Sequence, residues 1–132
     1  MTIRIATLIA TIATVFQQVA MGMSQRDEGI IREVAAEYVL TKHETALLLA
    51  IRIVENGGPG IEFGIGSDQK KHPARRFAGD YEKSLRLQAQ WCAGTIKKRY
   101  RGSTLDAFAK RYCPPNHRWW AQTVREKMKR WG

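Results

Sequence analysis

Apolar residues recur at three- and four-residue intervals along most of this chain, which is the spacing of one face of an α-helix. The pattern predicts five helices, which run from Ser24 to about Val39, from Thr41 to Glu55, from Asp80 to Gly102, from Ser103 to Pro114, and along the C-terminal segment to Trp131. The core is expected to take Ile30, Ile31, Val34, Ala35, Tyr38, Val39, Tyr81, Leu85, Ala89, Cys92, Ile96, Tyr100, Leu105, Phe108, Ala109, Tyr112, Trp120, Val124, Met128 and Trp131. The chain is therefore predicted to be mainly α, with a single helical domain over 24–132.

Local signals mark the ends of these helices. Thr41 with Glu44 and Ser103 with Asp106 have the spacing of capping boxes, in which two side chains satisfy free N–H groups at a helix start. Gly57 is expected to be the left-handed residue that stops the second helix. Prolines 114 and 115 should break the fourth helix.

A long connection separates the second and third helices. It covers about 23 residues, 57–79, and holds many glycines and a basic tract at 70–76. Such a connection in a helical domain is usually functional, so we expect a lid, a small lobe or one wall of a cleft, with a short strand or turn at 61–65. A phosphate cradle is not expected, because a helix ends rather than begins at these glycines.

Charge is spread unevenly over the 132 residues. The net charge is +10, but residues from Lys70 onward hold 17 basic and 4 acidic side chains. This half should attract a polyanion such as nucleic acid, anionic lipid or a wall polymer. No fingerprint of a DNA-reading motif accompanies it, so nucleic acid binding is expected to be non-specific at most.

The first 23 residues differ from the rest. No charge occurs between Arg4 and Arg26, and residues 5–16 are apolar apart from threonines. This hydrophobic helix has the layout of an export signal, with a permissible cleavage site at Ala20-Met21-Gly22. A releasable signal-anchor or a helix that docks on a membrane or virion partner remains an alternative.

Glu55 is the strongest candidate for chemistry. It stands in the last turn of an apolar helix, at the negative end of the helix dipole, with Leu48 and Ile51 on the same face. The helix dipole and the apolar neighbours both favour the protonated acid and so raise its pKa. Glycosidases use a raised pKa in this way to make a glutamate that can protonate a leaving sugar oxygen.

The residues around Glu55 carry a family resemblance. A helix that ends in Glu, followed by Asn56-Gly-Gly-Pro-Gly60 and by Phe63-Gly-Ile65, resembles the catalytic segment of the lysozyme-like superfamily of peptidoglycan-cleaving enzymes, which includes phage-associated glucosaminidases and lytic transglycosylases. A second run, from Phe108 to Asn116 and then Trp119-Trp120, is similar to the C-terminal pattern of that superfamily. The resemblance covers roughly residues 41–131. It departs from the pattern at Cys113, where alanine is commoner, and in a short stretch after Asn116.

The resemblance implies a lysozyme-like fold and roles for several residues. Glu55 would be the general acid and Tyr112 would line the cleft beside the reacting sugar, while Phe63 and Asn116 would contact substrate. A lytic transglycosylase needs one glutamate, whereas an inverting hydrolase needs a second carboxylate to hold a water. Glu62 is the first choice for that second group and Asp68 the next, although a solvated loop residue is an equally good interpretation of Glu62.

Periodicity and spacing add the remaining expectations. Trp120 should face the core, which leaves its neighbour Trp119 free to stack on a sugar. Cys92 and Cys113 are candidates for a disulfide in an oxidising compartment, or else Cys92 is a small core residue. The three histidines have no metal-ligand spacing, so neither a metal nor a cofactor is expected.

Two functions follow. The first is cleavage of peptidoglycan glycan strands in the bacterial envelope or periplasm, after export, or from a phage virion. The second is a non-catalytic phage structural or polyanion-binding module on the same fold.

Overall fold

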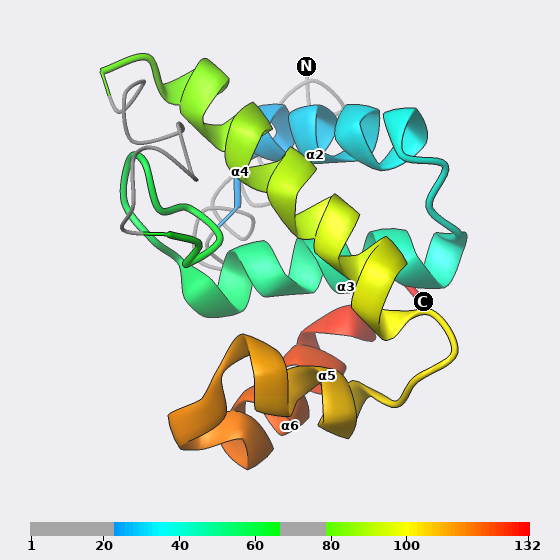
Figure 1. Ribbon diagram of the computed structural model, residues 1–132. Helices are drawn as coiled ribbons and strands as arrows, with labels where there is room; N and C mark the ends of the chain where they lie inside the picture. The colour runs from blue at the N-terminus through cyan, green and yellow to red at the C-terminus, as the bar shows by residue number, and fades with distance from the viewer. Residues whose placement is uncertain (1–22, 67–78) are drawn as a thin grey trace, which may run out of the picture.

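The computed structural model describes residues 23–66 and 79–132 and is mainly helical, as the sequence predicts (Figure 1). No strand forms in these two ranges. The elements in chain order are α2 (Gln25–Glu37), α3 (Lys42–Glu55), α4 (Tyr81–Thr95), the π-helical turn η2 (Ile96–Tyr100), α5 (Leu105–Tyr112), the 3-10 turn η3 (Pro114–Asn116) and α6 (His117–Met128).

Helix α3 runs through the centre of the molecule. It lies between the pair α2 and α4 on one side and the pair α5 and α6 on the other (Figure 1). Residues 46–51, the run Ala-Leu-Leu-Leu-Ala-Ile, are all buried. A helix that is apolar on every face belongs inside a protein. The central position of α3 is therefore a direct consequence of this run.

Most helix starts agree with the predicted signals. The Ser24 and Asp80 side chains accept from backbone N–H groups of the first turns of α2 and α4, and Thr41 and Glu44 form both bonds of a capping box. The predicted cap of α5 was wrong by one residue, because the Thr104 hydroxyl, rather than that of Ser103, accepts from the Ala107 N–H.

The predicted stop of α3 was also wrong by one residue. Asn56 takes the left-handed conformation, with φ of 43°, and donates its N–H to Arg52 O. Asparagine tolerates this region better than most residues do. Gly57 is required for a different reason: a Cβ there would lie 1.8 Å from Ile61 O, so only glycine lets the chain fold back this closely.

Two expected core residues lie at the surface. Val39 follows the end of α2, where the chain reverses with φ of 54°, and its side chain is 75% exposed. Tyr81 is 41% exposed in the first turn of α4, where its hydroxyl donates to the Asp27 carboxylate of α2. Periodicity alone misplaces both residues because each lies where a helix begins or has just ended.

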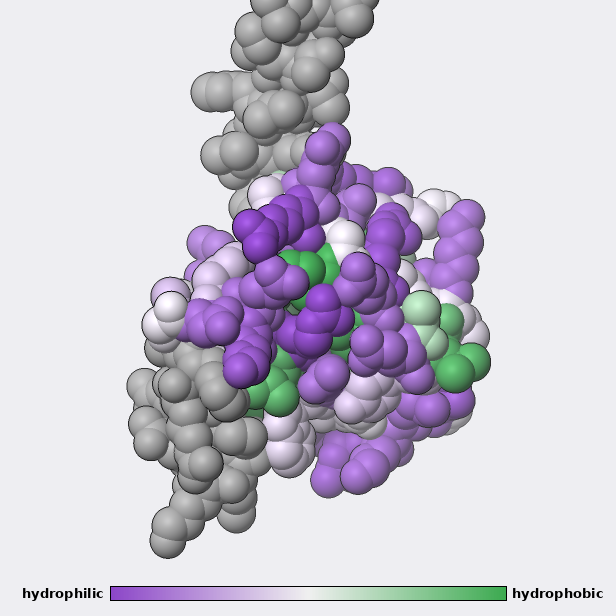
Figure 2. Space-filling model, turned by 90° about the horizontal axis from the view of Figure 1, so that it is seen from above, coloured by the Kyte–Doolittle hydropathy of each residue, from purple (hydrophilic) through white to green (hydrophobic). Residues whose placement is uncertain are grey.

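The described surface is largely hydrophilic on the face over α2 and α4, with small separate hydrophobic patches (Figure 2). Over 23–66 and 79–132, no helix has both the length and the apolar character needed to cross a bilayer. The predicted export or docking segment, apart from Met23, and the basic tract at 70–76 lie outside the described residues.

Candidate active site

The last residue of α3, Glu55, presents a half-buried carboxylate that is held by a side chain from the far end of the chain. Its Oε1 accepts the Nε1–H of Trp120, in α6, at 2.8 Å. Burial raises the pKa of Glu55, and the bond from Trp120 offsets part of this rise. Among the described residues, no other charged group contributes to this pKa shift. The carboxyl group is thus prepared to hold a proton and to release it.

Gly64 brings the loop after α3 directly against this carboxylate. A Cβ at position 64 would lie 2.4 Å from Glu55 Oε2, and the φ of Gly64 is +71°. The Gly64 N–H donates to Ile61 O at 2.8 Å and closes a turn over 61–64. Only glycine meets both the steric and the conformational demand at this point.

Tyr112 connects the same loop to Trp120. Its hydroxyl donates to Phe63 O at 2.6 Å, and its ring stacks on Trp120 with centroids 5.0 Å apart and an interplanar angle of 25°. Burial raises the pKa of Tyr112 well above its ordinary value, and the neighbouring Cys92 and Glu55 raise it further. The phenol therefore keeps its proton and remains a hydrogen-bond donor.

Two buried polar side chains anchor the loop to the helices behind it. Gln88 of α4 accepts the N–H groups of Phe63 and Ile65 at 3.1 and 3.3 Å, and donates to Ile65 O at 2.9 Å. Arg52 of α3 donates to Glu62 O at 3.2 Å. These bonds fix the backbone of 62–65 and thereby the position of Gly64 beside Glu55.

Glu62, the predicted second carboxylate, is a buried residue of this anchor. Its side chain has no exposed surface, and its Oε1 accepts from Ser84 Oγ at 2.6 Å and from the Gly60 N–H at 3.1 Å. It is therefore not the solvated loop residue of the alternative interpretation. Through its bond with Ser84, the Glu62 side chain attaches the loop to α4.

The predicted substrate contacts separate into three groups. The Phe63 side chain is wholly buried, so this residue reaches the site through its carbonyl, which Tyr112 binds. Asn116 is exposed at the end of η3, and Trp119 in the first turn of α6 is 60% exposed, as its periodicity predicted. Asp68 lies outside the described residues.

Sequence reasoning missed two members of the site. Trp120 was correctly placed in the core, where it is 1% exposed, but its indole N–H also binds Glu55. Gly64 was read as part of a loop, although its backbone lies so close to the carboxylate that a Cβ would clash with it. Both lie inside the two motifs of the resemblance, so the signal was present in the sequence.

The described residues offer little for metal or thiol chemistry. No group of three or more His, Cys, Asp or Glu side chains among them could hold a metal ion. Cys92 and Cys113 are free thiols, and burial raises the pKa of Cys92 to about 12, which makes it an inert core residue.

The chain has no match among protein-family models, curated proteins or solved structures.

Proposed function

We propose that this protein cleaves peptidoglycan glycan strands, on a lysozyme-like fold, with Glu55 as the general acid and base. The observation that carries the proposal is the state of the Glu55 carboxyl group. It is half-buried at a helix end, has a raised pKa, and is fixed between Trp120 Nε1 and Gly64. The helix dipole makes a carboxylate unfavourable at the C-terminal end of a helix. A glutamate that is fixed there has no evident structural purpose, which favours a chemical role.

The reaction begins with protonated Glu55. Its proton passes to the glycosidic oxygen, the bond from this oxygen to the anomeric carbon breaks with its electron pair going to the oxygen, and an oxocarbenium-like sugar remains. In the transglycosylase route, the Glu55 carboxylate then removes the proton of the C6 hydroxyl of the same sugar. The C6 oxygen bonds to the anomeric carbon, which gives a 1,6-anhydro product and restores the acid.

The arrangement of Glu62 favours this route over attack by water. A hydrolase of the inverting type needs a second carboxylate that faces a water. Glu62 instead lies inside the protein, where its Oε1 accepts hydrogen bonds from Ser84 Oγ and the Gly60 N–H. The other oxygen, Oε2, has no hydrogen-bond partner among the described residues, but it is buried as well. With Glu62 enclosed in this way, we assign Glu55 as the single reacting carboxylate.

The exposed side chains of the α6 start supply the contacts with sugar. We assign Trp119 to stacking on a sugar face, since this residue is 60% exposed in the same turn of α6 that holds Trp120. Asn116 is exposed at the same helix start and is assigned to a substrate hydroxyl. The substrate places the protein in the bacterial envelope or in a virion that must penetrate it.

The test is a digest of purified peptidoglycan by wild-type protein and by Glu55→Gln, which keeps the size of the side chain and removes its proton. We expect a loss of ~100-fold or more in rate, while Glu126→Gln, an exposed glutamate of α6, retains activity. Equal rates for wild type and Glu55→Gln would refute the proposal.

The products of the same digest distinguish the two routes. Mass spectrometry should find anhydromuramoyl ends, and Glu62→Gln should keep much of the rate. Reducing ends, with the rate lost in Glu62→Gln, would identify a hydrolase instead.

The alternative function is a non-catalytic module that binds a polyanion. Exposed Lys98, Arg99, Lys110 and Arg111 favour it, whereas Arg101 is already engaged by Glu44 at 2.9 Å. On duplex DNA, the logarithm of the affinity should fall against log salt with a slope of about −0.9 per phosphate contacted. Retention on DNA at physiological salt, together with no glycan cleavage, would support this module over the enzyme.

A further inference from the structure

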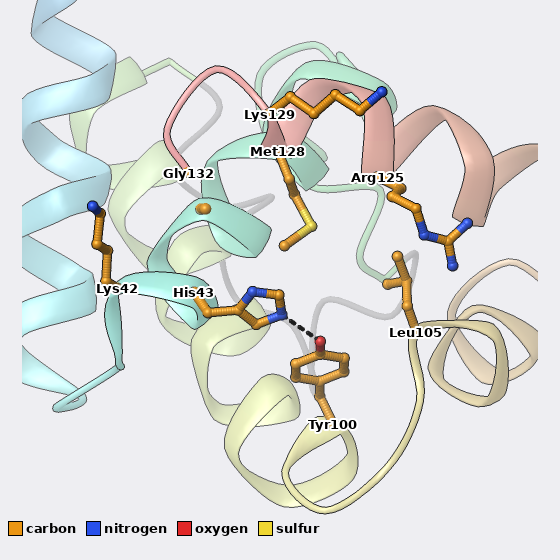
Figure 3. Close-up of a pocket in the computed structure, with 9 residues that line it drawn as sticks. Lys42, His43, Tyr100, Leu105, Arg125, Met128, Lys129 and Gly132 are labelled. Carbon is orange, nitrogen blue, oxygen red and sulfur yellow. Dashed lines mark hydrogen bonds between the residues drawn. The ribbon is translucent and has the colours of Figure 1, made fainter.

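A pocket of about 580 Å³ lies at the N-terminal end of α3, opposite to the end that carries Glu55 (Figure 3). This volume is in the range of pockets that bind small molecules. Four helical elements and two residues beyond α6 line it: Lys42, His43 and Ala46 of α3, Tyr100 of η2, Leu105 of α5, Arg125 and Met128 of α6, then Lys129 and Gly132. Because α3 has 14 residues, about 20 Å separates Lys42, at the start of α3, from Glu55 at its end.

The interior of the pocket is apolar. Ala46 and Met128 belong to the hydrophobic core, and Leu105 packs against it. The Met128 side chain points into the pocket, towards His43 and Tyr100 (Figure 3). A thioether adapts readily to the shape of an apolar group placed against it.

An aromatic pair holds one wall in place. His43 Nε2 and Tyr100 Oη share a hydrogen bond of 2.6 Å, and their rings stack with centroids 5.8 Å apart. Tyr100 lies in the π-helical turn and also meets Phe108 edge to face at 5.7 Å. These contacts fix the wall before any ligand arrives, which lowers the entropic cost of binding.

The rim of the pocket is cationic. Lys42 and Arg125 lie on opposite sides of it, and Lys129 passes along its upper edge (Figure 3). Arg125 has a partner in Asp106 at 3.6 Å, an exposed pair. Within residues 23–66 and 79–132, neither Lys42 nor Lys129 forms an ion pair, so two positive charges at the rim are left for a ligand.

We infer that this pocket binds a small, freely dissolved anionic amphiphile, in which the acidic group meets one of the rim lysines and an apolar body enters between Met128, Leu105 and Ala46 (Figure 3). A membrane lipid fits less well. The large exposed hydrophobic residues of the described chain are Val39, Ile61, Tyr81, Trp91 and Trp119, and none of them lines the pocket. The mouth thus lacks the apolar side chains that would enter a bilayer. This inference is independent of the proposed enzymatic function.

The test is calorimetric titration of the full chain with octyl phosphate, below its micellar concentration, compared with inorganic phosphate and octyl glucoside. Octyl phosphate has both an anionic group and an alkyl chain. Inorganic phosphate has only the anionic group, and octyl glucoside has only the alkyl chain. We expect octyl phosphate to bind one site per chain, at least about tenfold more tightly than either of the others. The methyl resonance of Met128 should shift in the same titration.

A matched pair of variants locates the binding. Lys42→Gln with Lys129→Gln should weaken octyl phosphate at least about tenfold, whereas Lys98→Gln with Lys110→Gln should not, although the net charge changes equally. All four lysines are exposed, so folding should survive, and thermal unfolding checks this.

Three results would overturn the inference. They are equal weakening by the two pairs of substitutions, equal binding of inorganic phosphate, and binding of anionic lipid vesicles that displaces octyl phosphate and depends on Lys42 and Lys129. The first two would indicate general electrostatic attraction and the third a membrane-binding surface.

Discussion

The indole of Trp120 donates its Nε1–H to Glu55 Oε1 at 2.8 Å and so joins two residues that are 65 positions apart in the chain. The same indole stacks on Tyr112, whose hydroxyl binds the loop at Phe63 O. α3, α6, α5 and the loop after α3 therefore meet at one carboxylate. A change in any of these contacts should be detectable at Glu55.

Trp120→Phe tests the bond to the carboxylate. The Trp120 bond stabilises the ionised form and lowers the pKa of Glu55, so its removal should raise that pKa further. Since the reaction starts from protonated Glu55, the basic limb of the activity profile should move to higher pH. Trp131→Phe is the control, because Trp131 donates to Glu28 instead. An unmoved basic limb in Trp120→Phe would show that Glu55 does not set this limb.

Gly64→Ala tests the contact between the loop and Glu55. The new Cβ would meet the carboxylate at 2.4 Å, and the positive φ would cost about 1–2 kcal/mol. We expect at least a ~10-fold loss of rate together with a fall in melting temperature. Gly102→Ala has the same conformational cost at φ of +75° and no neighbour within 4 Å. It should lose stability alone, and a similar loss of rate in both variants would contradict the assignment of Gly64.

Glu55→Gln should also change the dependence of stability on pH. The pKa of Glu55 is higher in the folded protein than in the unfolded chain. Ionisation of Glu55 therefore lowers the free energy of unfolding as the pH rises above the ordinary pKa of a glutamate. The variant lacks this cost. Its melting temperature should exceed that of wild type at about pH 7, and the difference should vanish at about pH 3.5. A variant less stable than wild type at neutral pH would contradict the raised pKa.

Arg101→Gln should give a pH dependence of the opposite sign. The Arg101 guanidinium holds the pKa of the buried Glu44 carboxyl at about 2, so this pair stabilises the fold above pH 4.5 and is lost as pH falls towards 2. We expect Arg101→Gln to lower the melting temperature at neutral pH. The difference in melting temperature from wild type should narrow as the pH falls from 4.5 towards 2. Arg99→Gln, two residues earlier and exposed, should change little. A gap independent of pH would show that Arg101 acts by packing.

Local patterns in the sequence determined the helices and the candidate acid. The apolar residues before Glu55 predict an apolar helix, the capping box at Thr41 predicts its start, and both are present because they depend on residues three or four positions apart. The same spacing separates Trp120, which is buried, from its exposed neighbour Trp119. Placement of Glu55 in the last turn of α3 needed nothing beyond these local rules.

Tertiary structure alone decided what surrounds the acid. Ser84 and Gly60 bind the Glu62 carboxylate in the interior, and no spacing in the sequence relates Glu62 to a serine 22 residues later. In the same way, the indole of Trp120 becomes a donor to Glu55 because α6 packs along α3. Hydrophobic burial brings such segments together without regard to their separation in the chain, and each polar group then needs a partner from whichever segment lies beside it. For this reason periodicity could predict which residues are buried, but not which hydrogen bonds they form once buried.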